Sequence, residues 1–189
     1  LFLFWGVVIG GLFLRLAWLG RASLQIDEIV TIRDALAQPN IASIYQTELQ
    51  RFFWYRVLPL FMFPIHWMGL LWHGTEGFPP EWLLRLPSAL IGAATIPLCY
   101  MLGKELGGRR VGWMALVFAA ISPFHIYYSR EAYAYGYVMF FCAGVLWMSL
   151  RLLQHDWKGS KLLPWKIGLG YVAFAIGFIH SHLTAMLFL

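Results

Sequence analysis

Apolar runs of membrane-spanning length recur along the chain and constrain its fold more than any other feature. Arg15 is the only Asp, Glu, Lys or Arg inside these five runs, which cover residues 1–20, 86–103, 111–128, 132–150 and 167–189. Each run approaches the roughly 20 residues that a helix needs to cross the hydrocarbon core of a bilayer. We therefore predict an all-α fold, a polytopic bundle of transmembrane helices.

The composition agrees with a membrane protein. Hydrophobic residues make up 60% of the chain and charged residues 12%, about half the charge of a typical soluble domain. We find no internal repeat and no linker, so we expect one domain. The sequence starts without Met and stops inside an apolar run, and we interpret residues 1–189 as the N-terminal part of that domain.

Positive charge gathers in two loops between apolar runs. Residues 104–110 and 151–166 hold every lysine of the chain and together carry +5, which equals the net charge of the whole chain. Because basic loops stay on the cytoplasmic side of a membrane, this excess indicates topology and not binding of nucleic acid. With both loops in the cytoplasm, the stretch around residues 122–131 faces outside, as does the stretch after the first span.

The segment 52–72 does not fit a simple span. It contains Arg56, Pro59, Pro64 and His66, and proline inside a helix removes a hydrogen bond and kinks the helix. A full crossing here would also invert every later run and move the basic loops outside. We predict a broken element that lies beside the membrane or enters it without crossing.

The first charged cluster, Asp27 and Glu28, follows the first apolar run in LQIDEIVTIRDALAQPN. Helical spacing groups Ile29, Ile32 and Leu36 on an apolar stripe, whereas Asp27, Thr31 and Asp34 form a polar one. This pattern predicts an amphipathic juxtamembrane helix at about 27–37. The two acids have a purely structural alternative, because carboxylates stabilise the positive N-terminal end of a helix.

The second cluster lies in SPFHIYYSREAYAYG, residues 122–136. We expect Ser129 to cap the next helix and to place Arg130 and Glu131 in its first turn, with Tyr133 on the face of Arg130. The alternatives are an interfacial belt of tyrosines and an arginine that extends to the membrane surface.

Several motifs that are typical of soluble enzymes are absent from the sequence. It has no Walker loop, no GxGxxG, no CxxC and no HExxH, so it shows no site for a soluble nucleotide. Its histidines lack metal-ligand spacing, and His180 and His182 point in different directions from a regular helix. Any chemistry is therefore expected at the outer membrane face, where both charged clusters lie.

The stretch 85–136, which begins RLPSALIGAATIPLCYMLGKELGGRR and ends SREAYAYG, closely resembles bacterial polytopic glycosyltransferases of the GT-C superfamily. That group is similar to protein O-mannosyltransferases and to transferases that modify lipid A and lipopolysaccharide. Asp27 and Glu28 match the acidic pair of its first external loop, and HSHLTA, residues 180–185, looks like its later helix with histidine. The resemblance implies a GT-C-like bundle that moves a sugar from a polyprenyl-phosphate donor to an acceptor, with inversion.

The resemblance also implies roles for individual residues. Asp27 would be the general base, and Glu28 would orient Asp27 or the acceptor. Arg130 would bind the donor phosphate, with Tyr133 and His182 as further donor contacts. Glu131 has two alternatives, holding Arg130 or helping to bind a divalent cation, and no metal requirement is predicted. Relatives often have a second arginine where this chain has Tyr133, which makes Arg51 and Arg56 alternative phosphate ligands.

The expected partners are a polyprenyl-phosphate sugar, a glycan, lipid or protein acceptor and the surrounding membrane lipids, with no nucleic acid. The expected location is the bacterial inner (plasma) membrane, crossed several times, with the active site on its external, periplasmic face. The alternative is a polytopic lipid carrier or transporter component, or an inactive relative, because charges inside a membrane also mark transport pathways.

Overall fold

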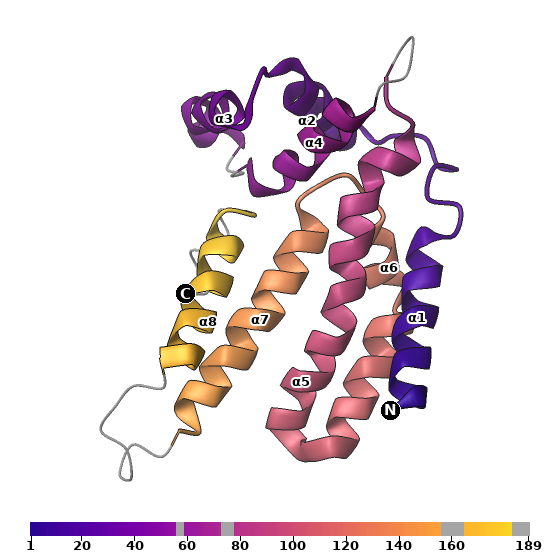
Figure 1. Ribbon diagram of the computed structural model, residues 1–189, viewed down its shortest axis with the longest axis vertical. Coiled ribbons are helices and arrows are strands. Elements are labelled where there is room, and N and C mark those ends of the chain that lie inside the picture. The colour runs from indigo at the N-terminus through magenta and orange to yellow at the C-terminus, as the bar shows by residue number, and fades with distance from the viewer. Residues whose placement is uncertain (56–58, 73–77, 156–164, 183–189) are drawn as a thin grey trace.

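Upright helices and a layer across one end make up the fold, which a computed structural model describes over residues 1–55, 59–72, 78–155 and 165–182. The upright set is α1 (Phe2–Leu16), α5 (Glu81–Ile121), α6 (Pro123–Ser129), α7 (Tyr135–Leu153) and α8 (Trp165–Ile179). The layer is α2 (Ile26–Ala37), α3 (Ile41–Tyr55), η1 (Pro59–Phe61) and α4 (Met62–Leu71) (Figure 1). These described residues contain no strand, which confirms the predicted all-α fold.

Helix α5 is a hairpin, because its path reverses at Gly107 and Gly108 (Figure 1). Gly108 has φ +76°, a backbone conformation that glycine adopts without the steric cost of a Cβ atom. A Cβ added to Gly112 would lie 3.0 Å from the carbonyl oxygen of Tyr100, so the two legs approach closely. The basic stretch 104–110 forms this turn, at the end of the molecule away from α2–α4.

The buried charge of α1 has a structural partner at the end of α5. Pro123 has no N–H group, so the carbonyl of Ala119 loses its helical hydrogen bond. The Arg15 guanidinium replaces that donor at 2.9 Å and also donates to the carbonyl of Ala120 at 3.2 Å. Its Nη2 lies 2.7 Å from Nδ1 of His125 on α6. Arg15 thus joins α1, α5 and α6.

A buried apolar cluster attaches the end layer to the upright helices. Its members come from α2, α3, η1, α4, α5, α7 and the loop before α7: Ile32, Ala35, Ile44, Phe61, Met62, Ile65, Leu84, Ala132, Ala134 and Tyr137. Because these side chains lie between the layer and the bundle, the position of α2 is determined by packing as well as by hydrogen bonds.

Two of the described helices, α5 and α7, are long and apolar enough to cross a membrane, and three shorter segments are apolar: Phe2–Leu16, Pro59–Leu71 and Trp165–Ile179. The five spans expected from hydropathy remain a prediction, and residues 183–189 of the last one lie outside the described part. Of the segment 52–72, the described residues are the end of α3, η1 and α4, which belong to the end layer.

Helix α2 confirms the helix predicted at about 27–37, but its buried face differs from the predicted stripe. Glu28, Thr31, Ile32 and Ala35 are buried, whereas Ile29 is about half exposed. Glu28 can lie on the inner face because a buried arginine neutralises its charge, and hydropathy alone does not include that partner.

The expectation that Ser129 caps the next helix is wrong. Ser129 ends α6 and α7 begins at Tyr135, so Arg130 and Glu131 lie in a loop between the helices. Tertiary hydrogen bonds stabilise this non-helical loop. The Ala132 N–H donates to the Glu28 carboxylate, and Arg130 donates to the carbonyl of Trp18.

Candidate functional site

Glu28 is the buried anchor around which the site is built. Only 1% of its surface is exposed, and its carboxylate accepts from Arg85 twice, from Nε at 2.8 Å and from Nη2 at 2.7 Å. The backbone N–H of Ala132 donates to it at 2.8 Å and that of Gln25 at 3.1 Å. Four donors use the acceptor sites of the carboxylate, so Glu28 positions chain segments and has no free oxygen for a substrate.

Arg85, near the start of α5, carries the other half of this anchor. It is 3% exposed, and Nη1 donates to the carbonyls of Leu19 at 3.1 Å and Ala22 at 2.8 Å. Glu81 adds a second carboxylate at 3.5 Å. A planar guanidinium suits such a set of acceptors, and here it binds the linker after α1 and the start of α2 to α5.

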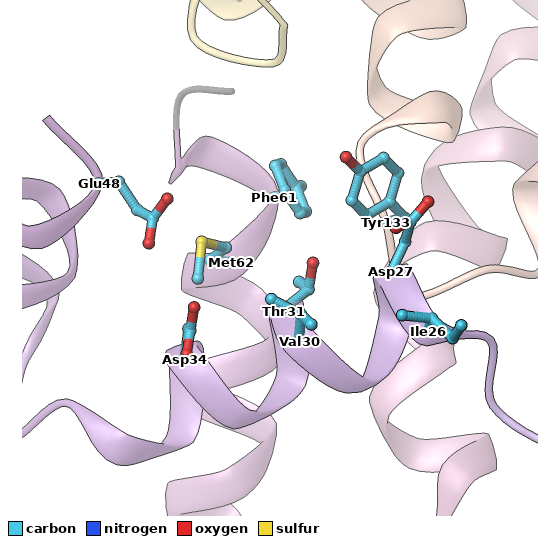
Figure 2. Close-up of a pocket in the computed structure, with 9 residues that line it drawn as sticks. All are labelled: Ile26, Asp27, Val30, Thr31, Asp34, Glu48, Phe61, Met62 and Tyr133. Carbon is cyan, nitrogen blue, oxygen red and sulfur yellow. The ribbon is translucent and has the colours of Figure 1, made fainter. Parts of the chain in front are cut away.

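Asp27, next to this anchor, borders a cavity of about 230 Å³. The cavity lies between α2, α3, η1, α4 and the loop before α7, and its lining residues are Ile26, Asp27, Val30, Thr31, Asp34, Glu48, Phe61, Met62 and Tyr133. Figure 2 shows Asp27 beside the ring of Tyr133 at one end of this outer cavity, with Glu48 at the other end. The exposed carboxylate of Asp27 can therefore reach a hydroxyl group of a molecule bound in this cavity.

Asp27 and Tyr133 also line a second pocket of about 110 Å³, which we term the tyrosine pocket. The remaining lining residues are Gln25, Glu28, Tyr127, Tyr128, Glu131 and Tyr135. Asp27 therefore lies on the boundary between the outer cavity and a pocket made of tyrosines and carboxylates.

A third pocket, of about 140 Å³, continues from the tyrosine pocket towards the linker after α1. It is lined by Leu19, Ala22, Ser23, Gln25, Glu28, Arg85, Tyr127, Arg130 and Glu131, and we term it the arginine pocket. Glu131 borders both pockets. Arg130 is held by its hydrogen bond to the carbonyl of Trp18, at 2.8 Å.

The two buried glutamates of the site differ in electrostatic environment. Burial raises the pKa of Glu28, but hydrogen bonds from Arg85, Ala132 and Gln25 outweigh it and hold this pKa below its usual value. Burial raises the pKa of Glu131 above its usual value; a hydrogen bond from Tyr127 opposes this effect and the charge of Glu28 adds to it. Glu28 therefore stays ionised in the fold, whereas ionising Glu131 costs more in the fold than in water.

The structure brings together five of the six residues that the sequence indicated. Asp27, Glu28, Arg130, Glu131 and Tyr133 line the three adjoining pockets. His182 follows α8 and is not among the residues that line them. Its neighbour His180 accepts a hydrogen bond from Leu60 through its carbonyl, so this chain end lies beside η1.

Sequence reasoning missed Arg85, although one signal was available: a lone arginine at the start of an otherwise uncharged run needs a partner. Arg56 and the side chain of Arg51, the alternative phosphate ligands, lie outside the described part. Within that part, no group of three or more His, Cys, Asp or Glu side chains is arranged to hold a metal ion.

Comparison with known proteins identifies the family. No curated protein and no solved structure matches the chain. The family profile named dolichyl-phosphate-mannose-protein mannosyltransferase matches residues 63–189, which include Arg85 and the loop that carries Arg130 and Glu131. Because this match covers more than half of the 189 residues, the chain belongs to that family and is a membrane glycosyltransferase of the mannosyltransferase type.

Proposed function

We propose that the three adjoining pockets transfer a sugar from a polyprenyl-phosphate carrier to an acceptor hydroxyl, with inversion at the anomeric carbon and with Asp27 as general base. The family implies a lipid-linked sugar donor and a glycan or protein acceptor in a membrane. The observation that carries the proposal is the order of the pockets, in which Asp27 lies between the outer cavity and the tyrosine pocket and Arg130 lies beyond.

This order suits a single displacement. The acceptor occupies the outer cavity, the sugar the tyrosine pocket and the donor phosphate the arginine pocket, so that the nucleophile and the leaving group lie on opposite sides of the anomeric carbon. The acceptor oxygen bonds to that carbon as its bond to the phosphate oxygen breaks. Asp27 takes the proton of the acceptor hydroxyl. Arg130 stabilises the charge that develops on the polyprenyl phosphate.

Glu28 and Arg85 act on this reaction through position. Their ion pair holds the first turn of α2, which carries Asp27, against the loop that carries Arg130. Because base and phosphate ligand lie on different segments, a shared anchor keeps their separation constant during the reaction. His182, which follows α8 and does not line the three pockets, is kept as a proposed donor contact from the family resemblance alone.

The arrangement of charges supports a reaction at the external, periplasmic face of a bacterial inner membrane. The site lies at the end of the bundle covered by α2–α4, and the basic turn 104–110 lies at the opposite end (Figure 1). Arg151, in the last turn of α7, forms an ion pair at 3.7 Å with Glu105 of the basic turn 104–110. The positive-inside rule assigns this basic end to the cytoplasm.

The test compares Asp27→Asn with wild type in the full-length protein in nanodiscs, using a radiolabelled polyprenyl-phosphate hexose and a mixture of envelope acceptors. We expect transfer to fall about 100-fold or more, with donor binding within about twofold of wild type because Asn keeps the size of the side chain. Asp34→Asn, on the same helix and cavity, controls for the loss of one negative charge. Glu105→Gln, at the opposite end, controls for the procedure.

Near-normal transfer by Asp27→Asn would remove Asp27 as the base. An equal loss in Asp34→Asn would point to the cavity charge in general. Donor binding by wild type without transfer to any acceptor would favour the lipid-carrier or inactive alternative.

A further inference from the structure

The tyrosine pocket has a continuous aromatic wall. Tyr127 contacts Tyr128 with ring centroids 5.1 Å apart, Tyr128 contacts Tyr135 at 4.8 Å, and Tyr135 contacts Tyr133 at 5.0 Å. Phe61 supports Tyr133 from η1 at 5.4 Å. Four phenol rings in a continuous chain of contacts provide apolar faces and hydroxyl groups together, which suits a ligand that has both C–H and O–H groups.

The charged groups of this pocket are all acidic. Its lining includes the carboxylates of Asp27, Glu28 and Glu131, and no described lining residue is a lysine or an arginine. The Glu28 carboxylate is occupied by its four donors, which leaves Asp27 and Glu131 to face a ligand. Glu131 is 8% exposed, so solvent screens its charge poorly. Arg130 lies in the adjoining arginine pocket.

We infer that the tyrosine pocket holds the transferred sugar and selects sugars that carry no carboxylate, with Glu131 as the main determinant of this specificity. The inference rests on the proposed function, which places the sugar in this pocket. The hydroxyl groups of a neutral hexose donate hydrogen bonds to the carboxylates of Asp27 and Glu131, and its C–H faces stack on the tyrosine rings. An amino sugar adds a cation beside two carboxylates and aromatic faces. A uronic acid would bring a further carboxylate next to those of Asp27 and Glu131, and like charges in close contact weaken binding strongly.

The experiment measures binding of three donors to the full-length protein in nanodiscs without acceptor: polyprenyl-phosphate-linked hexose, amino-hexose and hexuronate. We expect wild type to bind the hexuronate at least about tenfold more weakly than the hexose, and the amino-hexose at least as tightly as the hexose. Glu131→Gln should reduce the discrimination against hexuronate to about threefold, because the amide keeps the shape of the side chain and removes its charge. Glu105→Gln, outside the site, should leave the discrimination unchanged.

A second variant keeps the inference testable if Glu131→Gln does not fold. Tyr135→Lys adds a positive charge at the exposed rim of the pocket, and we expect it to improve hexuronate binding relative to hexose. Equal binding of hexuronate and hexose by wild type would overturn the inference, as would an unchanged ratio in both site variants. If wild type discriminates between these donors but transfers none of them in the acceptor assay described above, the proposed function is contradicted and the selectivity of the pocket is still supported.

Discussion

Replacing Glu28 by Gln tests whether the buried ion pair holds the site together. The amide oxygen of Gln can still accept from the Ala132 N–H, but the new NH₂ group faces Arg85 Nη2 and the Gln25 N–H, both of which are donors. Two hydrogen bonds are lost, and one of them is to a charged group. Removing one partner of a buried ion pair costs about 3–5 kcal/mol.

Arg85 keeps its carbonyl acceptors at Leu19 and Ala22 in this variant, so its charge is not left entirely without partners. We therefore expect the lower part of the range, a loss of about 3 kcal/mol in the free energy of unfolding. For a chain of about this length, such a loss lowers the melting temperature by about 6–12 °C. The assay is thermal unfolding in detergent, monitored by the loss of the monodisperse peak in size-exclusion chromatography.

Arg33→Gln on the same helix is the matched control. It breaks an ion pair of similar length, Arg33 with Asp34 at 3.0 Å, but Arg33 is 63% exposed, and exposed pairs contribute about 0–1 kcal/mol. Burial is therefore the main difference between the two substitutions. If Glu28→Gln melts within about 2 °C of Arg33→Gln, the assignment of Glu28 and Arg85 as the anchor is wrong.

The pH dependence of the free energy of unfolding tests the same ion pair. The fold lowers the pKa of Glu28, so its contribution to stability is present above the unfolded pKa and is lost as the pH falls through the folded pKa. The stability difference between wild type and Glu28→Gln should therefore shrink in acid. A difference that stays constant down to the acid end of the titration would contradict this linkage.

Three further substitutions test other parts of the fold by the same unfolding assay. Glu131→Gln should stabilise the protein at neutral pH and not in acid, because a raised pKa means that the contribution of Glu131 is lost as the pH rises; equal effects at both pH values would refute this. Gly92→Ala should cost about 1–3 kcal/mol because the new Cβ would overlap the side chain of Ser129 and lie 3.3 Å from its Cα atom. Gly10→Ala, with nothing within 4 Å of the new Cβ, is its control and should be neutral or stabilising. Arg15→Met should cost about 2–4 kcal/mol by removing the donors to one buried and one partly buried carbonyl, and an unchanged melting temperature would show that these carbonyls find other partners.

Local chemistry predicted several elements of this protein well. The amphipathic spacing after the first apolar run predicted a helix at 27–37, and the structure has α2 at Ile26–Ala37. The end of this helix was predictable because Pro39 and Asn40 end the helical pattern. The loop predicted at 104–110 between two apolar runs is the turn of α5 at Gly107 and Gly108. Two sequence clusters more than 100 residues apart were expected to share one face, and their side chains line adjoining pockets.

Local chemistry predicted the loop 130–134 poorly. A serine followed by charged residues is typical of a helix start, yet the backbone N–H of Ala132 is bound by a carboxylate from α2, a partner that no local window contains. The same holds for the inner face of α2, which is polar at Glu28 because α5 supplies Arg85.

The sequence by itself determined the class of the protein, its helical content and the two charged clusters proposed to form the site, because hydropathy, proline and glycine act over a few neighbouring residues. Only the tertiary structure decided which carboxylate is available for chemistry. Asp27 and Glu28 are adjacent and chemically alike, but Glu28 is enclosed by four donors from three segments, whereas Asp27 borders two cavities. The difference comes from which side of one helical turn meets Arg85, and that depends on the packing of α2 against α5.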